Sequence, residues 1–425
     1  MISLLIQLAT QPAMAWGSHF LIANGALQHP SVDYADDLVA AESLEDFLAA
    51  TGQDLPALFD GYYDWLEARG SKRFNRMSFD PNNPTVVEFL HAARLNPAAH
   101  FALTNRPIPG ATRVGEPMDK LEVSPYLSLI LPPFASDFDR VEPGQEVSAG
   151  SVLCTFADEP DWGFDHELWD FAEYGYGEIP YGKPQGESSK AAFHVLYAHE
   201  NFLVRMSAPE ILEGMSADRV EMFLRLSRFA FAHGHDYWGY RFAAWATHFA
   251  QDLAQPYHSM AIPSARAPFY LHYVVSPRKP KLKAEATQLT LNRHFLYEDF
   301  VSYGLQQSAL TDDAPFDEMV AYLGKGDATL AGVSDTDGLI ATIGQRASDH
   351  APTIDRTVRK AFGGKLTEDP SYDVEHAPDY DVAKVIAGME PKAAAKLVVE
   401  TGTDFTLAGE GTRTIVALAR TGQTP

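Results

Sequence analysis

The strongest constraint on the fold is the segment 219–253, RVEMFLRLSRFAFAHGHDYWGYRFAAWATHFAQDL, in which apolar and aromatic side chains recur at helical spacing. Residues three and four apart lie on the same side of a helix. The segment predicts one helix or two, with Gly234 as the joint and Asp236 as the N-cap of the second. Its apolar and aromatic side chains are expected in the core.

Helical spacing also covers residues 43–70, with a break between Gly52 and Pro56, and residues 338–362 and 381–421. The exception is the segment 103–157, which is rich in proline and glycine and predicts an irregular insertion. These patterns predict an all-α fold, a multi-helix bundle with irregular loop insertions. We expect residues 16–310 to form one helical domain and residues 311–425 a C-terminal helical extension.

Composition narrows the functional classes. The 425 residues are 46% hydrophobic, which is ample for a large core in one or two domains. The excess of 57 acidic over 33 basic residues gives a formal charge of −24, which repels polyanions at long range and disfavours sequence-reading nucleic-acid binding. Cys154 is the single cysteine, so an intramolecular disulfide framework is excluded and a buried thiol is expected.

The first fifteen residues, MISLLIQLATQPAMA, resemble a signal peptide. A short apolar run ends in an A-x-A-like site at residues 13–15, which predicts cleavage before Trp16. No later stretch approaches the ~20 apolar residues that are needed to cross a bilayer. We therefore expect a secreted or periplasmic protein.

The stretch HFAQDLAQPYHS places charge-bearing side chains in otherwise apolar surroundings. On a helix, His248 and Asp252 are four residues apart and hence neighbours on one face. Pro256 is expected to end that helix and turn the chain so that His258 points back toward the pair. Three potential metal ligands would then converge.

A second pair, His294 and Glu298 in LNRHFLYEDFV, repeats the same spacing on another aromatic segment. One interpretation is a set of buried histidines that hydrogen-bond to carboxylates. Two such pairs and an added histidine, all in surroundings that make unpaired charge costly, favour a metal site instead.

The pattern His248-x-x-x-Asp252-x-x-Gln255-Pro256-x-His258, followed by His294-x-x-x-Glu298, resembles the signature of the zinc-dependent phospholipase C and P1/S1 nuclease superfamily. In that family the mature chain begins with a tryptophan whose amine and carbonyl bind a metal, and a histidine soon after binds the same ion. Trp16 and His19 fit this pattern directly after the expected cleavage site.

The resemblance implies two further ligands, an aspartate and a histidine. FADEPDWGFD offers Asp158 and Asp161, of which the PD context favours Asp161. SSKAAFHVLYAHENF offers His194 and His199, and GFDHELW adds His166; the phenylalanine beside His194 favours that residue. The segments 161–194 and 258–294 are longer than the small phospholipases suggest, which implies loop insertions near the mouth of the site.

The resemblance further implies three zinc ions enclosed by the helices. One ion would be held by Asp161, His194, His248 and Asp252. A second would be held by the Trp16 terminus, His19 and Asp252 as a bridge, and a third by His258, His294 and Glu298. Imidazole and carboxylate ligands suit zinc and leave a position for water.

The implied activity is phospholipase C-like phosphodiester hydrolysis by a zinc-activated water, with Asp161 as the base that takes its proton. The expected partner is a phospholipid or another phosphodiester, with peripheral membrane contact. Two alternatives are a P1/S1-type nuclease, which would need aromatic side chains that stack on bases, and a non-catalytic helical protein that zinc stabilises.

Overall fold

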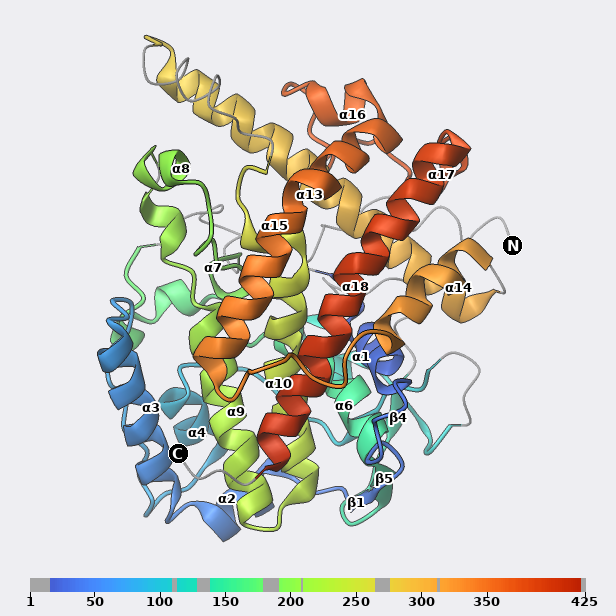
Figure 1. Cartoon of the computed structure of the whole chain (residues 1–425). Coiled ribbons are helices and arrows are strands. Elements are labelled where there is room, and N and C mark those ends of the chain that lie inside the picture. The colour runs from blue at the N-terminus through green and yellow to red at the C-terminus, as the bar shows by residue number, and fades with distance from the viewer. Residues whose placement is uncertain are drawn as a thin grey trace.

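Helix α10 (Asp236–Ala254) runs through the middle of the molecule (Figure 1). Every residue of α10 after Asp236 is buried. The helices α9 (Ser216–Ala232), α18 (Pro391–Arg420), α6 (Ala149–Ala157) and α15 (Thr336–Phe362) all pack against it. A helix covered on all sides needs apolar residues around its whole circumference, which explains its composition.

The structure is a computed structural model that describes residues 16–108, 113–127, 138–178, 191–207, 209–263, 276–311 and 314–421. Helices account for 62% of it and strands for 4%, so the predicted all-α fold is confirmed. The expected signal peptide, residues 1–15, lies outside the described residues. Among the described helices, none is both long and apolar enough to cross a membrane.

The predicted joint between two helices is confirmed. Gly234 lies between α9 and α10 with a φ of +77°, a left-handed conformation that a residue with a Cβ adopts only with strain. Asp236 is the first residue of α10 and not its N-cap, which is His235. A carboxylate in the first turn still interacts favourably with the helix dipole.

The amino-terminal part forms α1 (His19–Leu27), β1 (Leu38–Ala40), α2 (Leu44–Thr51), α3 (Leu55–Arg69) and α4 (Val86–Ala92). The predicted break between α2 and α3 is present. Ser43 caps α2 by accepting a hydrogen bond from the Asp46 amide, and Pro56 lies in the first turn of α3. Gly70 ends α3 in a left-handed conformation.

The segment 103–157, expected to be irregular, contains short strands and helices. Strands β2 (Thr104–Asn105), β4 (Phe138–Arg140) and β3 (Pro117–Met118) form an antiparallel sheet in that order, and α5 covers Lys120–Val123. Strand β5 (Glu146–Ser148) pairs with β1, Val147 opposite Val39. Helix α6 follows and is almost wholly buried. Cys154 lies on α6 and is buried, as expected.

The middle of the chain contains short elements and the remaining core helices. These are η3 (Glu159–Trp162), η4 (Leu168–Asp170), η5 (Ala172–Tyr174), α7 (Ala191–His194), α8 (Phe202–Ser207), η7 (Pro209–Leu212), α11 (Pro256–Ser259) and the long α13 (Lys279–Leu310). The short elements η3, α7 and α11 all contact α10, and each places one side chain, Asp161, His194 or His258, near the last two turns of α10.

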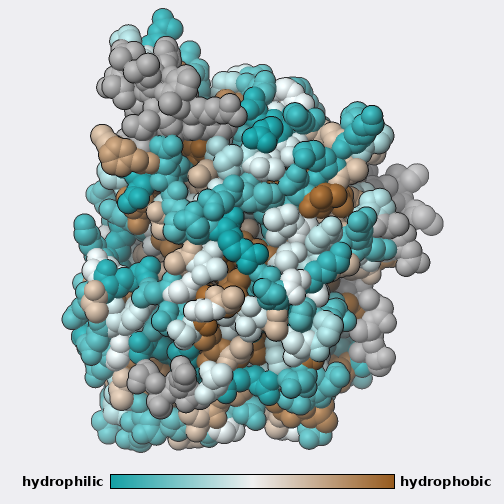
Figure 2. Space-filling model, in the orientation of Figure 1, coloured by the Kyte–Doolittle hydropathy of each residue, from teal (hydrophilic) through white to brown (hydrophobic). Residues whose placement is uncertain are grey.

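The C-terminal part comprises α14 (Ala314–Ala321), η8 (Tyr322–Gly324), α15, α16 (Gly364–Glu368), α17 (Val382–Ala387) and α18. Helices α15 and α18 pack side by side against α10, and α18 also contacts α1 (Figure 1). The buried residues of α15 recur three and four apart, as expected for a helix with one face in the core. The outer face of this region mixes hydrophilic and apolar residues in small groups (Figure 2).

Candidate metal centre

The structure brings the predicted side-chain ligands together from six elements. Within each of three groups, the potential ligand atoms lie within 4.8 Å of one another. The groups are His19, His248 and Asp252; Asp161, His194 and His248; and His258, His294 and Glu298. A fourth group of the described residues, Asp373, Glu375 and His376, lies at the surface, where acidic clusters are common without a metal.

The turn after α10 arises as the sequence predicts. His248 Nε2 lies 3.4 Å from Asp252 Oδ2, as expected for residues four apart on a helix. Pro256 begins the short helix α11, and the Gln255 side chain caps it by accepting from the Tyr257 amide. The chain thereby turns back, and His258 Nδ1 comes to lie 3.6 Å from Asp252 Oδ1.

Asp252 lies between His19 of the first group and His194 of the second, and it directs one carboxylate oxygen toward each. Its Oδ2 is 2.8 Å from His194 Nδ1, beside His248. Its Oδ1 is 3.5 Å from His19 Nε2. The carboxylate is fully buried. A carboxylate placed in this way could bind two cations, one through each oxygen.

The third group is the most open. His294 Nε2 lies 2.7 Å from Glu298 Oε1 on α13, and His258 Nε2 is 3.1 Å from His294 Nε2 and 3.2 Å from Glu298 Oε1. The His294 side chain is 18% exposed, whereas those of Glu298 and His258 are 3% and 2% exposed. The side of the centre nearest His294 therefore faces solvent.

Hydrogen bonds to carbonyl oxygens select the tautomer of three histidines. His248 Nδ1 lies 2.8 Å from the Ala157 carbonyl oxygen, and His258 Nδ1 lies 3.1 Å from that of His194. His19 Nδ1 lies 2.8 Å from Gln251 Oε1. Because these oxygens can only accept, each Nδ1 carries the proton, and a neutral ring then presents the lone pair of Nε2 to the groups.

Two buried atoms of the centre that lack a hydrogen-bond partner fit a bound cation. Asp252 Oδ1 and His19 Nε2 are completely buried and have no hydrogen-bond partner. Buried polar atoms without partners are costly and rare, and a metal ion between them would satisfy both. Tetrahedral zinc with ligands at about 2.0–2.1 Å separates its ligand atoms by roughly 3.3 Å. His248 Nε2 and His194 Nδ1, 3.2 Å apart, match this spacing.

Electrostatics also favour a cation. Burial lowers the pKa of His194, but hydrogen bonds to Asp165 and Asp252 outweigh burial and raise the pKa to about 10. Burial raises the pKa of Glu298, yet the neighbouring His294 and His258 lower it to about 2. Positive charge beside these carboxylates is therefore favourable, and protons or metal ions can supply it.

The structure also distinguishes between the candidate ligands that the sequence left open, two aspartates and three histidines. Asp158 Oδ1 accepts a hydrogen bond of 3.1 Å from the Phe20 amide, and Arg106 forms a buried ion pair with Oδ2. Asp158 therefore anchors α1 beside η3, whereas Asp161, on η3 itself, lies in the second group. His199 lies beside Gly344 of α15, and the His166 ring packs on Tyr126; neither histidine belongs to one of the three groups.

Trp16 is fully buried, three residues before His19. Its ring meets Phe405 of α18 edge to face at 5.5 Å, and its carbonyl oxygen accepts a hydrogen bond of 2.6 Å from the Ser18 amide. The expectation that the Trp16 amine binds a metal depends on cleavage after residue 15, which the described residues do not include. Metal binding by the Trp16 amine therefore stays a prediction.

Several residues that support the centre were not predicted. Glu159 on η3 accepts hydrogen bonds from Arg241 Nε at 2.9 Å and Trp245 Nε1 at 2.6 Å, and this buried cluster fixes η3 on α10. Gln251, which orients His19, is itself held by a 3.0 Å hydrogen bond from its Nε2 to Thr412 Oγ1 on α18. These partners lie 82, 86 and 161 residues apart in sequence, so no local pattern connects them.

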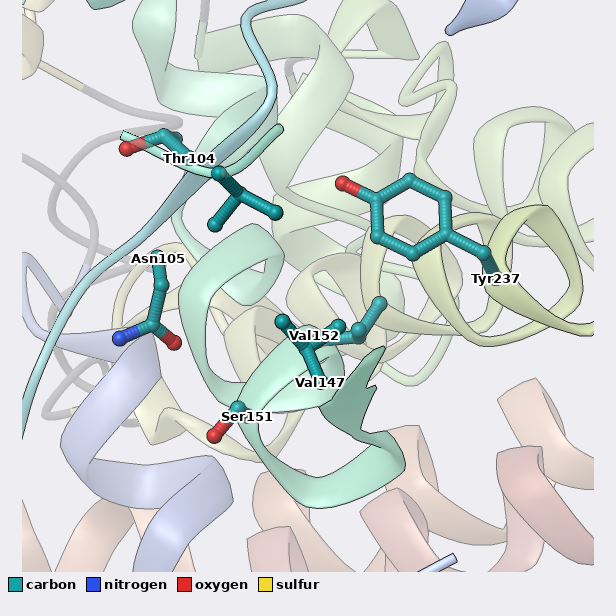
Figure 3. A pocket seen from close by; sticks show the side chains of 7 residues that line it. Thr104, Asn105, Val147, Ser151, Val152 and Tyr237 are labelled. Atoms are coloured by element: carbon teal, nitrogen blue, oxygen red, sulfur yellow. The ribbon is translucent and has the colours of Figure 1, made fainter. Parts of the chain in front are cut away.

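A small hollow lies at the opposite end of α10 (Figure 3). It is lined by Thr104, Asn105, Val141, Val147, Ser151, Val152 and Tyr237, and it has no room for a water molecule. Tyr237 precedes His248 by eleven positions, or roughly 16 Å along a helix that rises about 1.5 Å per residue. The hollow is therefore separate from the metal centre, and its lining offers no acidic or basic side chain.

Comparison with known proteins gave no match to a family model, to a curated protein or to a solved structure.

Proposed function

We propose that the protein is a zinc-dependent phosphodiesterase of the phospholipase C type, which holds three zinc ions. The observation that carries the proposal is the closeness of the three groups: Asp252 directs one oxygen to each of the first two, and its Oδ1 lies 3.6 Å from Nδ1 of His258, whose Nε2 belongs to the third. Cations clustered in this way suit the hydrolysis of phosphodiesters, whose negative charge they neutralise.

When bound, zinc lowers the pKa of a coordinated water to about 7 and so supplies hydroxide at neutral pH. Asp161 is the proposed base. Its Oδ1 lies 3.9 Å from His248 Nε2, and its side chain is 6% exposed. From that position the carboxylate can accept the proton of a water that attacks phosphorus. His258, His294 and Glu298 would hold the third zinc ion, whose charge would attract the phosphate on the solvent side.

Exposure favours a catalytic over a purely structural role. A structural zinc site is closed, whereas a catalytic site keeps one position for water or substrate. The His294 side chain, 18% exposed, gives the third group access to solvent. The formal charge of −24 repels nucleic acid at long range, which favours a small phosphodiester such as a phospholipid headgroup as the substrate.

The test begins with the full chain produced in a secretory host. Native mass spectrometry reports both the first residue and the number of bound zinc ions. Hydrolysis is then measured on phosphatidylcholine vesicles and on single-stranded DNA, for the wild type and for Asp161→Asn. His376→Gln, which changes the exposed group Asp373, Glu375 and His376, is the matched control.

The proposal predicts three zinc ions, a chain that begins at Trp16, and release of a phosphorylated headgroup by the wild type and His376→Gln. Asp161→Asn should retain at least two zinc ions and lose most of the activity. Cleavage of DNA alone would establish the nuclease alternative. Three zinc ions without hydrolysis of either substrate would establish the structural role and refute the enzyme.

A further inference from the structure

Two charged side chains beside the metal centre belong to none of its three groups. Asp165 is completely buried and follows η3, and Arg219, 2% exposed, lies in the first turn of α9. They form an ion pair between Arg219 Nη2 and Asp165 Oδ1. A buried carboxylate is costly unless it is paired, and the guanidinium supplies that pairing.

The guanidinium of Arg219 is itself fixed. Its Nη1 and Nη2 both donate to the Arg94 carbonyl oxygen at 3.3 Å, and its Cζ lies 4.7 Å from the centre of the Phe193 ring. Phe193 directly precedes His194 on α7. Arg219 therefore holds Asp165 against the same short helix that carries the metal-binding histidine.

Asp165 faces the far side of the His194 ring. Its Oδ2 lies 3.5 Å from His194 Nε2, and both atoms are buried. The other ring nitrogen, Nδ1, faces Asp252 Oδ2 at 2.8 Å and His248 Nε2 at 3.2 Å. His194 thus differs from His19, His248 and His258, which direct Nε2 into the centre.

For Nδ1 to bind a metal, the neutral His194 ring must carry its proton on Nε2. Asp165 Oδ2 is the acceptor beside that proton, and a carboxylate behind a metal-bound histidine fixes the ring and makes it a stronger ligand. We propose that Asp165, oriented by Arg219, positions His194 for metal binding and selects its Nδ1-coordinating tautomer. This inference rests on the proposed metal centre.

The test is zinc affinity of the full chain, measured by competition with a chelator, for the wild type, Asp165→Asn and His194→Ala. Asp139→Asn is the matched control, because Asp139 is also completely buried and paired with an arginine, Arg113, but lies in β4 away from the centre. The double variant Asp165→Asn/Arg219→Gln removes both charges together, which avoids a buried unpaired guanidinium.

Asp165→Asn should weaken the binding of one zinc ion about 10- to 100-fold and leave the others unchanged. The visible spectrum of the cobalt-substituted protein should change with it, because the orientation of one ligand changes. Asp165→Glu should restore part of the affinity. Asp139→Asn should bind zinc as the wild type does. The double variant should show the same loss of affinity as Asp165→Asn.

Two outcomes separate the possible failures. If His194→Ala loses a zinc ion while Asp165→Asn and the double variant bind zinc as tightly as Asp139→Asn, the positioning role is refuted and the metal centre stands. If His194→Ala and the wild type bind zinc alike, the centre itself has been assigned to the wrong residues, and the role of Asp165 is refuted with it.

Discussion

His350 on α15 connects this helix to α18, and the contribution of that connection to the stability of the fold can be measured. Its Nδ1 lies 2.6 Å from Asp404 Oδ1 and its Nε2 lies 2.9 Å from Glu400 Oε2, both on α18. Two carboxylate acceptors require both ring nitrogens to donate, so the ring is an imidazolium. Burial lowers the pKa of His350, but the hydrogen bonds and charges of Asp404 and Glu400 outweigh it and raise the pKa to about 9.

The size of the effect follows from the difference between the folded and unfolded pKa. With an unfolded value near 6.5, a rise of roughly 2.5 units at about 1.36 kcal/mol per unit corresponds to ~3 kcal/mol of stability. Burial also raises the pKa of Asp404, which offsets part of this gain, so ~3 kcal/mol is an upper value. Since the folded pKa is raised, the contribution is complete below pH 6.5 and is lost as the pH rises through 9.

The assay is urea unfolding of the wild type and His350→Gln at matched zinc concentrations between pH 6 and pH 9.5. The difference in unfolding free energy between the two proteins should be largest at pH 6 and should shrink as the pH approaches 9. Because the two proteins are compared at each pH, the effects of all other titrating groups on the unfolding free energy cancel. A difference of the same size at pH 6 and pH 9.5 would refute the charged state of His350.

Three further predictions concern the centre and its supports. Asp252→Ala should lower the zinc content by at least two ions, because its oxygens face separate groups; loss of a single ion, measured by elemental analysis, would contradict the bridge. Gln251→Leu should weaken the zinc ion beside His19 and spare the third group, which zinc titration measures; equal weakening of all ions would argue against the tautomer assignment. Gly409→Ala should destabilise the protein by about 1–3 kcal/mol in urea unfolding, because the added Cβ would overlap the Leu323 carbonyl oxygen of η8; unchanged stability would show that α18 can move away.

Local spacing in the sequence was sufficient for the parts of the centre that lie within one or two helical turns. His248 and Asp252, or His294 and Glu298, are neighbours because a helix makes residues four apart neighbours. Pro256 turns the chain because the residue before a proline disfavours the helical conformation. These predictions needed no knowledge of distant residues.

The remaining features depend on contacts between distant segments. Asp158 and Asp161 lie in the same short stretch, and the structural role of Asp158 depends on its ion pair with Arg106, 52 residues away. The support of His194 by Asp165 likewise needs Arg219, 54 residues further on. A buried ion pair has no signature in sequence spacing, because its partners only need to meet in three dimensions.

The hydrogen bonds from His19 to Gln251 and from Gln251 to Thr412 connect the start of the chain to its last helix, and these parts are synthesised at different times. His19 emerges near the start of the chain and Glu298 completes the set of predicted side-chain ligands, but Gln251 is anchored by Thr412. At a translation rate of about 5–20 residues per second, Thr412 follows Glu298 by roughly 6–23 s. A nascent chain therefore contains every predicted side-chain ligand before α18, which supports Gln251, has been made. A chain interrupted between α15 and α18 would expose α1 and α10 while still carrying all of the predicted side-chain ligands.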